Sequence, residues 1–186
     1  MFIQTEETPN PATLKFLPGR EVMGAAGTRD FRDASGAGVS PLAESLFAVG
    51  GVAGVFLGRD FVTVTKGEGQ DWPALKPVVL GTIMDHFTSG RPVVNEGSAA
   101  VEAPGGAADS DIVTQIKEIL DYKIRPAVAQ DGGDIVFDKF EDGVVYLHMQ
   151  GACAGCPSSS ATLKTGIENM LRHYIPEVTE VRQAAS

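Results

Sequence analysis

Cysteine is scarce in this sequence, with 2 residues among 186. Cys153 and Cys156 are separated by only two residues, so a bridge between them would close too small a loop to hold a fold together. A disulfide-stabilised scaffold is therefore excluded, and we expect both thiols to be reduced, as they are in the cell interior.

Positive charge is also in short supply. The chain has 15 lysines and arginines against 24 aspartates and glutamates, which gives a net charge of −9. Recognition of nucleic-acid phosphates depends on clustered lysine and arginine. We therefore expect no nucleic acid among the partners of this protein.

Long hydrophobic runs are missing. No stretch approaches the roughly 20 consecutive apolar residues that a membrane span needs. The first residues include Glu6 and Glu7 and lack the basic segment and apolar stretch of a targeting peptide. These features predict a soluble, cytoplasmic protein with no membrane partner.

Composition divides the chain into two parts. Residues 92–108 are rich in glycine, alanine and proline, contain no large apolar residue beyond valine and show no sustained period. This composition is typical of a flexible linker. We therefore predict two small α+β domains, residues 1–91 and residues 109–186, joined by this linker.

The first domain alternates strand and helix signals. Apolar and β-branched runs predict strands at residues 2–5, 13–17, 52–57 and 61–65. Ser40 followed by Pro41 predicts a helix start, and a second helix is expected over residues 72–87. Pro77 lies inside that second helix and makes its first turn uncertain.

The second domain has a more regular pattern. A helix with a 3.6-residue apolar period is predicted from a cap at Ser110 to a stop at Pro126. A turn at residues 131–134 leads to a hairpin of strands 135–140 and 144–149, and a helix then runs to Pro176. With a final strand at residues 177–182, the predicted order is α-β-β-α-β.

The chemistry concentrates in residues 151–160, between the second strand and the second helix of this domain. The loop contains Cys153-Ala154-Gly155-Cys156, whose spacing lets both sulfurs turn toward one atom. Such a pair suits zinc, an iron–sulfur cluster or a thiol–disulfide couple. The dipole of the helix that follows would favour thiolates.

Counting the ligands narrows these possibilities. A structural zinc site needs four ligands and a 4Fe–4S cubane needs one thiolate per iron. The chain has only two sulfurs of this kind and three histidines, none with the spacing that would complete a site. A two-fold axis that brings two loops together would supply four thiolates. We therefore hypothesise that a 4Fe–4S cluster is shared between two copies of the chain through Cys153 and Cys156.

Three other features have structural interpretations. The sequence Asp131-Gly132-Gly133-Asp134 fits a tight turn better than a metal loop. The serines at positions 158–160 lack a base for nucleophilic catalysis and are expected to cap the helix. Lys117, Lys123, Arg125 and Lys164 are interpreted as a solvated helix face that could also contact an acidic partner.

Several long segments resemble one family. Residues 125–135, 151–159 and 162–168 are similar to the C-terminal domain of the NifU-like (Nfu) proteins. Residues 2–11, with Leu14-Lys15-Phe16 after them, resemble the N-terminal Nfu domain. The two resemblances cover nearly the whole chain outside the linker.

This resemblance implies a cluster carrier or scaffold that is not an enzyme. Its expected cargo is a 4Fe–4S cluster bound by Cys153 and Cys156 at a homodimer interface. Its expected partners are an upstream cluster donor and apo-proteins that receive the cluster. The order strand, Cys-x-x-Cys, helix also leaves a thioredoxin-like thiol–disulfide oxidoreductase as the alternative.

Overall fold

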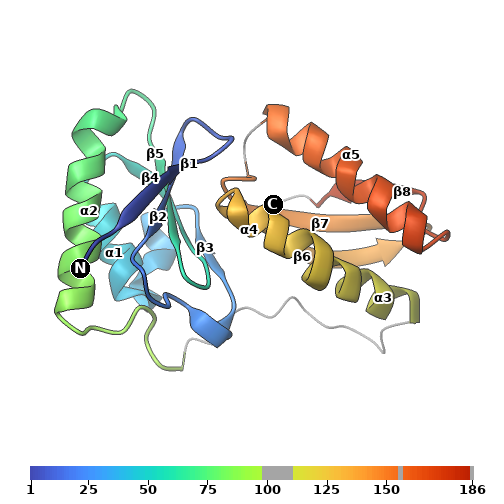
Figure 1. Ribbon diagram of the computed structural model, residues 1–186, viewed down its shortest axis with the longest axis horizontal. Helices are drawn as coiled ribbons and strands as arrows, with labels where there is room; N and C mark the ends of the chain where they lie inside the picture. Colours follow the sequence, from blue (N-terminus) through green and yellow to red (C-terminus); the bar gives the residue numbers. More distant parts are fainter. Residues whose placement is uncertain (98–110, 155–156, 185–186) are drawn as a thin grey trace. The chain divides into compact units, whose positions relative to one another are not determined.

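A computed structural model describes residues 1–97, 111–154 and 157–184, without the side chains of residues 157–160 (Figure 1). The chain divides into two compact units, Met1–Ala100 and Val101–Ser186. Each unit combines helices with one sheet, so the predicted α+β class is confirmed. None of the helices within the described ranges is both long enough and apolar enough to cross a membrane.

The first unit is a five-stranded antiparallel sheet with two helices. Its strands are β1 (Gln4–Glu7), β2 (Thr13–Leu17), β3 (Arg29–Phe31), β4 (Val52–Leu57) and β5 (Val62–Lys66). They lie in the order β1-β2-β5-β4-β3. The helices α1 (Pro41–Ala48) and α2 (Trp72–Thr88) pack with the sheet around a shared core. The sequence predicted β2 and β4 at these bounds, placed β1 two residues early and missed β3.

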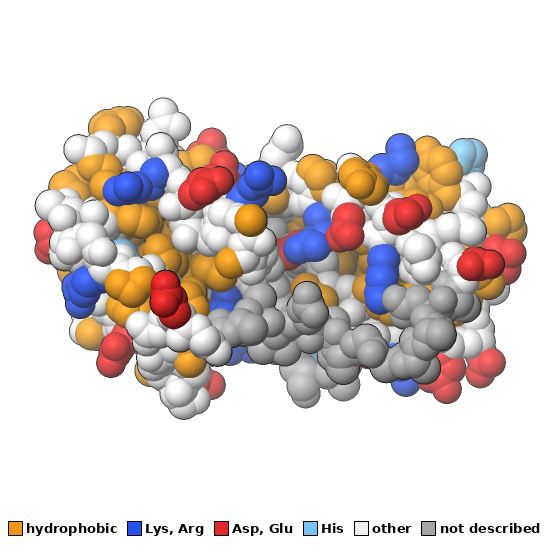
Figure 2. Space-filling view, turned by 90° about the horizontal axis from the view of Figure 1, so that it is seen from below, with side chains coloured by type: hydrophobic (Ala, Val, Ile, Leu, Met, Phe, Trp, Pro, Cys, Tyr) orange, Lys and Arg blue, Asp and Glu red, His pale blue; other side chains and the backbone are white. Residues whose placement is uncertain are grey.

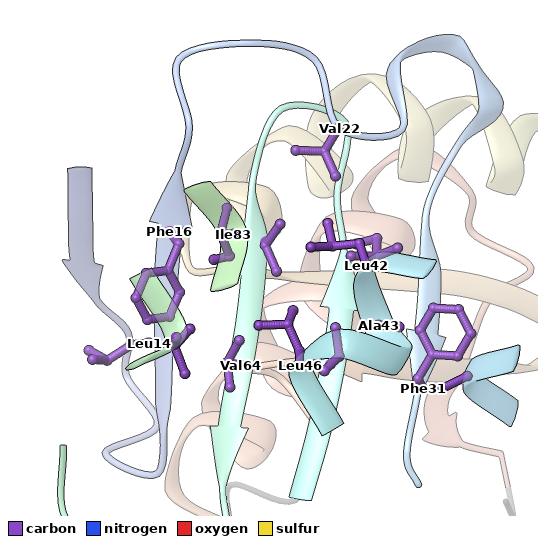
Figure 3. Close-up of a cluster of buried hydrophobic side chains, with 14 of the residues drawn as sticks. Leu14, Phe16, Val22, Phe31, Leu42, Ala43, Leu46, Val64 and Ile83 are labelled. Atoms are coloured by element: carbon purple, nitrogen blue, oxygen red, sulfur yellow. The ribbon is translucent and has the colours of Figure 1, made fainter. Parts of the chain in front are cut away.

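Apolar side chains of the strands and of the two helices build this core. Leu14 and Phe16 of β2 and Val64 of β5 meet Leu42 and Ile83 of the two helices, as Figure 3 shows. The β-branched run of β5 suits a pleated strand that is buried on its core face. The five side chains are almost completely buried, so the core is the main source of stability in this unit.

Ser40 begins helix α1 as the sequence predicted. Its Oγ accepts a hydrogen bond from the backbone N–H of Ala43 at 3.1 Å and donates one to the carbonyl oxygen of Val93 at 2.6 Å. The backbone N–H of Asn95 donates to the carbonyl oxygen of Val39 at 2.8 Å. These bonds attach residues 93–95 to the first unit, beyond its predicted end at residue 91. Residues 98–108 of the predicted linker lie outside the described residues.

Helix α2 continues through Pro77. The helix begins at Trp72 and presents Leu75, Val79 and Ile83 to the core. Pro77 removes one backbone donor, but the packed face on the following turns holds the helix together. The predicted helix over residues 72–87 is therefore confirmed, with its first turn formed.

The second unit places its helices on one face of a three-stranded sheet (Figure 1). Strands β6 (Gly133–Glu141) and β7 (Val144–Gly151) form an antiparallel hairpin, and β8 (Glu180–Gln183) pairs parallel to β7. Helix α5 (Pro157–Tyr174) connects β7 to β8. The buried core combines side chains of these elements with others from the helical segment before β6 and from the cysteine loop. Its members include Ile116, Leu120, Ile135, Leu147, Met149, Cys153, Ile167, Leu171 and Val181.

The first helix of this unit does not stop at Pro126, so that prediction is wrong. Helix α3 (Asp111–Ile119) passes into a π-helical turn, Leu120–Ile124, and then into α4 (Arg125–Gln130). The backbone N–H of Arg125 reaches the carbonyl oxygen of Leu120, five residues earlier. Pro126 therefore falls in the first turn of α4, where a missing N–H costs little. The order α-β-β-α-β is otherwise confirmed, and the predicted cap Ser110 lies outside the described residues.

Charged side chains are mixed on the surface. Figure 2 shows lysine and arginine interspersed with aspartate and glutamate on one face, rather than gathered in one basic patch. Lys139 lies 2.9 Å from Glu141, and Arg182 lies 2.9 Å from Glu180. Such exposed pairs contribute little to stability, so the fold depends on its two cores.

The first unit contains a buried histidine. His86 on α2 is completely buried, and neither of its ring nitrogens has a hydrogen-bond partner within the described residues. Burial lowers the pKa of His86, and the charge of Arg91 lowers it further. The folded unit therefore holds His86 in its neutral form.

We expect the first unit to lose stability as the pH falls below about 6.5, because the unfolded chain then binds a proton that folded His86 resists. The stability contribution is full above that pH and is lost as the pH falls toward the lowered pKa of the folded state. His86→Leu should flatten this dependence between pH 7 and pH 5. Urea unfolding followed by the fluorescence of Trp72, the only tryptophan of the chain, measures it. Equal pH dependence in the variant and the parent would contradict the assignment, and His173→Leu in the other unit is the control.

Candidate metal centre at the cysteine loop

The cysteine loop leaves the end of the β6–β7 hairpin. Gly133, the first residue of β6, pairs with Gly151, the last residue of β7. The loop then runs to Pro157, where α5 begins. The structure thus places Cys153 between a strand and a helix, as the sequence predicted. Its predicted partner Cys156 lies outside the described residues.

Two backbone hydrogen bonds hold the loop around Cys153. The N–H of Ala152 donates to the carbonyl oxygen of Gly132 at 3.2 Å, and the N–H of Ala154 donates to that of Gly151 at 3.1 Å. Gly132 and Gly151 have φ values of +79° and +63°, which glycine adopts more readily than other residues. The two glycines let the chain turn tightly on both sides of the hairpin end.

The Cys153 side chain points into the unit. The residue is 6% exposed and belongs to the hydrophobic core beneath the helices. Its Sγ lies against Gly133, where a Cβ would come within 2.6 Å of that sulfur and 2.7 Å of the carbonyl oxygen of Gln150. Since real Cβ atoms essentially never approach within 3.0 Å, the thiol occupies space that only glycine leaves free.

This contact changes the interpretation of the two central glycines. Gly132 fits the predicted turn through its positive φ, and the turn between α4 and β6 is confirmed. Gly133 already belongs to β6, and close approach to Cys153 is what requires glycine there. The sequence carried no signal for this contact, because the two residues are far apart in the chain.

Asp134 anchors the same end of the hairpin. Its carboxylate accepts two hydrogen bonds from the guanidinium of Arg125, at 2.9 and 2.8 Å, and one from the backbone N–H of Ile135 at 2.8 Å. Asp134 is 3% exposed. Hydrogen bonding to Asp134 raises the pKa of Arg125, despite the partial burial of the guanidinium. The pair joins α4 to the first residues of β6, beside Gly133.

The interpretation of four basic residues as a solvated helix face needs correction for Arg125. Arg125 forms the partly buried ion pair with Asp134 and a second contact with Asp121 at 2.9 Å. The other three have individual partners as well: Lys117 over the ring of Phe137, Lys123 over that of Tyr174, and Lys164 at 3.9 Å from Glu180. Helical spacing could have indicated the pair of Arg125 with Asp121, four residues earlier, but not the other partners, which lie on other elements.

The histidines do not approach Cys153 as a ligand group. His148 on β7 contacts Asp138 through Nε2 at 3.2 Å, and the ring of His173 packs edge-on against that of Tyr174. His86 belongs to the first unit. Within the described ranges, no three histidine, cysteine, aspartate or glutamate side chains gather as a metal site. Cys153 is thus the one predicted ligand whose place the structure describes.

Two family models match the chain. The model of the "Scaffold protein Nfu/NifU N terminal" matches residues 3–90, and that of the "NifU-like domain" matches residues 116–182. Together the two matches account for most of the chain. They correspond to the two structural units.

Curated relatives match over both units. Two proteins described as "NFU1 iron-sulfur cluster scaffold homolog, mitochondrial", from Drosophila sechellia and Drosophila simulans, are each 54% identical over 183 residues. The matches cover 98% of this chain and 65% of each relative, so the chain spans somewhat less than two thirds of their length. Both relatives are described as mitochondrial, which gives no support to the cytoplasmic location predicted from the sequence.

One solved structure has a partial likeness. The solution structure of a NifU-like protein from Saccharomyces cerevisiae is 25% identical, with a TM-score of 0.47. That match covers 52% of this chain and 86% of the yeast chain.

Loss of the Arg125–Asp134 pair should destabilise the second unit. We expect Arg125→Leu to lower the free energy of unfolding by about 2–4 kcal/mol, because the buried carboxylate of Asp134 loses this counter-charge. Arg172→Leu is a matched control, since Arg172 contacts Glu168 at 3.8 Å on an exposed helix face and should cost less than about 0.5 kcal/mol. Urea unfolding followed by far-ultraviolet circular dichroism measures both. Equal losses in the two variants would show that the Arg125 pair does not brace the hairpin.

Proposed function

Since this chain belongs to the family of Nfu and NifU scaffold proteins, we propose that it is an iron–sulfur cluster carrier. Two copies bind one 4Fe–4S cluster at their shared interface, each through Cys153 and Cys156. The cluster comes from an upstream donor and passes to apo-proteins. The cluster is cargo, and the chain is not an enzyme.

The observation that carries this proposal is the ligand supply at the cysteine loop. The chain has 2 cysteines, both in this loop. Within the described residues, no group of other metal-binding side chains exists that could complete a site. A cubane takes one thiolate per iron, so one chain supplies half of the ligands. A second copy related by a two-fold axis supplies the same half again.

Shared ligation suits release as well as binding. When four thiolates come from two chains, separation of the chains breaks two of the four iron–thiolate bonds and leaves the cluster on one chain with two protein ligands. The cluster is then exposed to competing thiolates of a recipient protein. Helix α5 begins at Pro157, directly after Cys156 in the chain, and the positive end of its dipole would favour thiolates and an anionic cluster near this end.

The relatives support the same class of function. Proteins described as iron-sulfur cluster scaffolds are 54% identical to this chain over both units. We propose that the first unit serves to dock clients or partners, since the cysteines all lie in the second unit.

Anaerobic reconstitution with iron and sulfide tests the ligand assignment. We expect a brown protein that absorbs broadly in the visible range and contains about four irons and four sulfides per two chains. Cys153→Ala and Cys156→Ala should each abolish the colour, because each removes two of the four thiolates of the dimer.

His148→Ala is the control for this experiment. His148 lies on the strand that leads into the loop but contacts Asp138, so the variant should retain the cluster. One tightly bound zinc and no iron in the reconstituted parent, or a cluster that survives either cysteine substitution, would refute the assignment.

A thioredoxin-like oxidoreductase is the second candidate. The order β7, cysteine loop, α5 is the observation that favours it. Against it, both cysteines precede Pro157 in the chain, where α5 begins, and no aromatic residue precedes Cys153 in the loop. In an insulin-reduction assay with a thiol reductant, we expect the iron-free chain to give no more than the background rate. Catalytic turnover by the iron-free chain would favour the oxidoreductase instead.

A further inference from the structure

The buried position of the Cys153 thiol conflicts with its proposed role as a cluster ligand. A cluster that bridges two chains lies at a surface, and its iron atoms bond the sulfur ligands directly. In the described structure Cys153 is 6% exposed and packs in the core of the second unit. In this position the thiol faces its own core rather than a second chain.

Gly133 creates the space in which the thiol is stored. A Cβ on Gly133 would lie 2.6 Å from Cys153 Sγ, 2.7 Å from the carbonyl oxygen of Gln150 and 3.1 Å from the backbone N of Cys153. Gln150 is part of the β6–β7 ladder, where it pairs with Asp134. Its carbonyl oxygen is therefore fixed, so a Cβ on Gly133 would meet the strand backbone as well as the thiol, and of these two neighbours only the thiol can move away.

The backbone around Cys153 is attached to the end of the hairpin next to two glycines at positive φ. Two hydrogen bonds, from Ala152 to Gly132 and from Ala154 to Gly151, fasten the loop to the hairpin. Gly151, at a φ of +63°, lies where the loop leaves the ladder, and Gly132, at a φ of +79°, lies in the turn before β6 and accepts the bond from Ala152. The ladder itself can stay intact while the loop turns.

We propose that Gly133 is a positioning residue that stores the Cys153 thiol inside the second unit, and that cluster binding requires the loop at residues 151–154 to turn this thiol outward. The described structure is the closed form of the loop. This inference rests on the proposed function, because it concerns the access of one cluster ligand. In the closed form, metal ions and oxidants in solution do not reach the Cys153 thiol until the loop opens.

The rate of thiol modification tests the closed form directly. Cys156→Ser leaves Cys153 as the only thiol of the full chain. Its thiolate attacks the disulfide of 4,4′-dithiodipyridine, a mixed disulfide forms, and 4-thiopyridone leaves and is measured by its absorbance. We expect the folded, iron-free variant to react at least about tenfold more slowly than the same variant unfolded in guanidinium, because reaction requires local opening.

Gly133→Ala in the same background tests the role of the glycine. Its methyl group would come within 2.6 Å of the present position of the sulfur, so we expect the thiol to be displaced and the rate of Cys153 modification to rise at least about fivefold toward the unfolded value. Gly166→Ala is the matched control, because Gly166 lies on α5 of the same unit and a Cβ there meets nothing within 4 Å. The control should change the rate by less than about twofold.

The dependence on urea separates loop opening from unfolding and does not need the Gly133 variant to fold. Below the unfolding transition, local opening predicts a modification rate of Cys156→Ser that stays nearly constant with urea. A rate that rises steeply with urea would mean that only global unfolding releases the thiol, and would overturn the proposal. Folded Cys153 that reacts as fast as unfolded Cys153, or a folded Gly133→Ala chain without acceleration, would also overturn it.

These experiments contain no iron, so they are independent of the proposed function. Slow modification of Cys153 in a chain that fails to take up a cluster would refute the proposed carrier function but support the proposal that the closed loop buries the thiol. Fast modification of Cys153 in a chain that binds the cluster would refute the proposal that the closed loop buries the thiol but support the carrier function.

Discussion

The contact between Gly133 and Cys153 is the constraint on which the candidate site depends. It lies where the β6–β7 hairpin ends, at the Gly133–Gly151 pair, and it places the sulfur of Cys153 against the backbone of Gly133. Because protein interiors are densely packed, a single added carbon at Gly133 has no empty volume to occupy. The hairpin end and the cysteine loop therefore form one packed structure.

The Arg125–Asp134 pair connects this hairpin end to the helical layer. The π-helical turn Leu120–Ile124 carries the helix past the point where Pro126 would have ended it, and α4 places Arg125 opposite Asp134. A bidentate guanidinium–carboxylate pair fixes orientation as well as distance. The first residues of β6 are thus braced from the helical layer, close to the residue that contacts the cysteine.

Local sequence signals predicted much of this fold and the place of the cysteine loop. The apolar period of α5, the cap at Ser40 and the apolar and β-branched runs of β2 and β4 depend on neighbours within a few positions. The seat of Cys153 against Gly133 and the partner of Arg125 depend on residues distant in sequence or on another element. The short strand β3 has only three residues, too few for a period, and it forms because β4 offers an edge to pair with.

The central claim is that two chains share one cluster through four thiolates. Native mass spectrometry of the anaerobically reconstituted full chain measures the number of chains, irons and sulfides in one particle. The account predicts a particle of two chains with four irons and four sulfides, and a single chain without iron after the cluster is removed by a chelator. A cluster found on single chains, or a pair of chains that carries zinc alone, would contradict it.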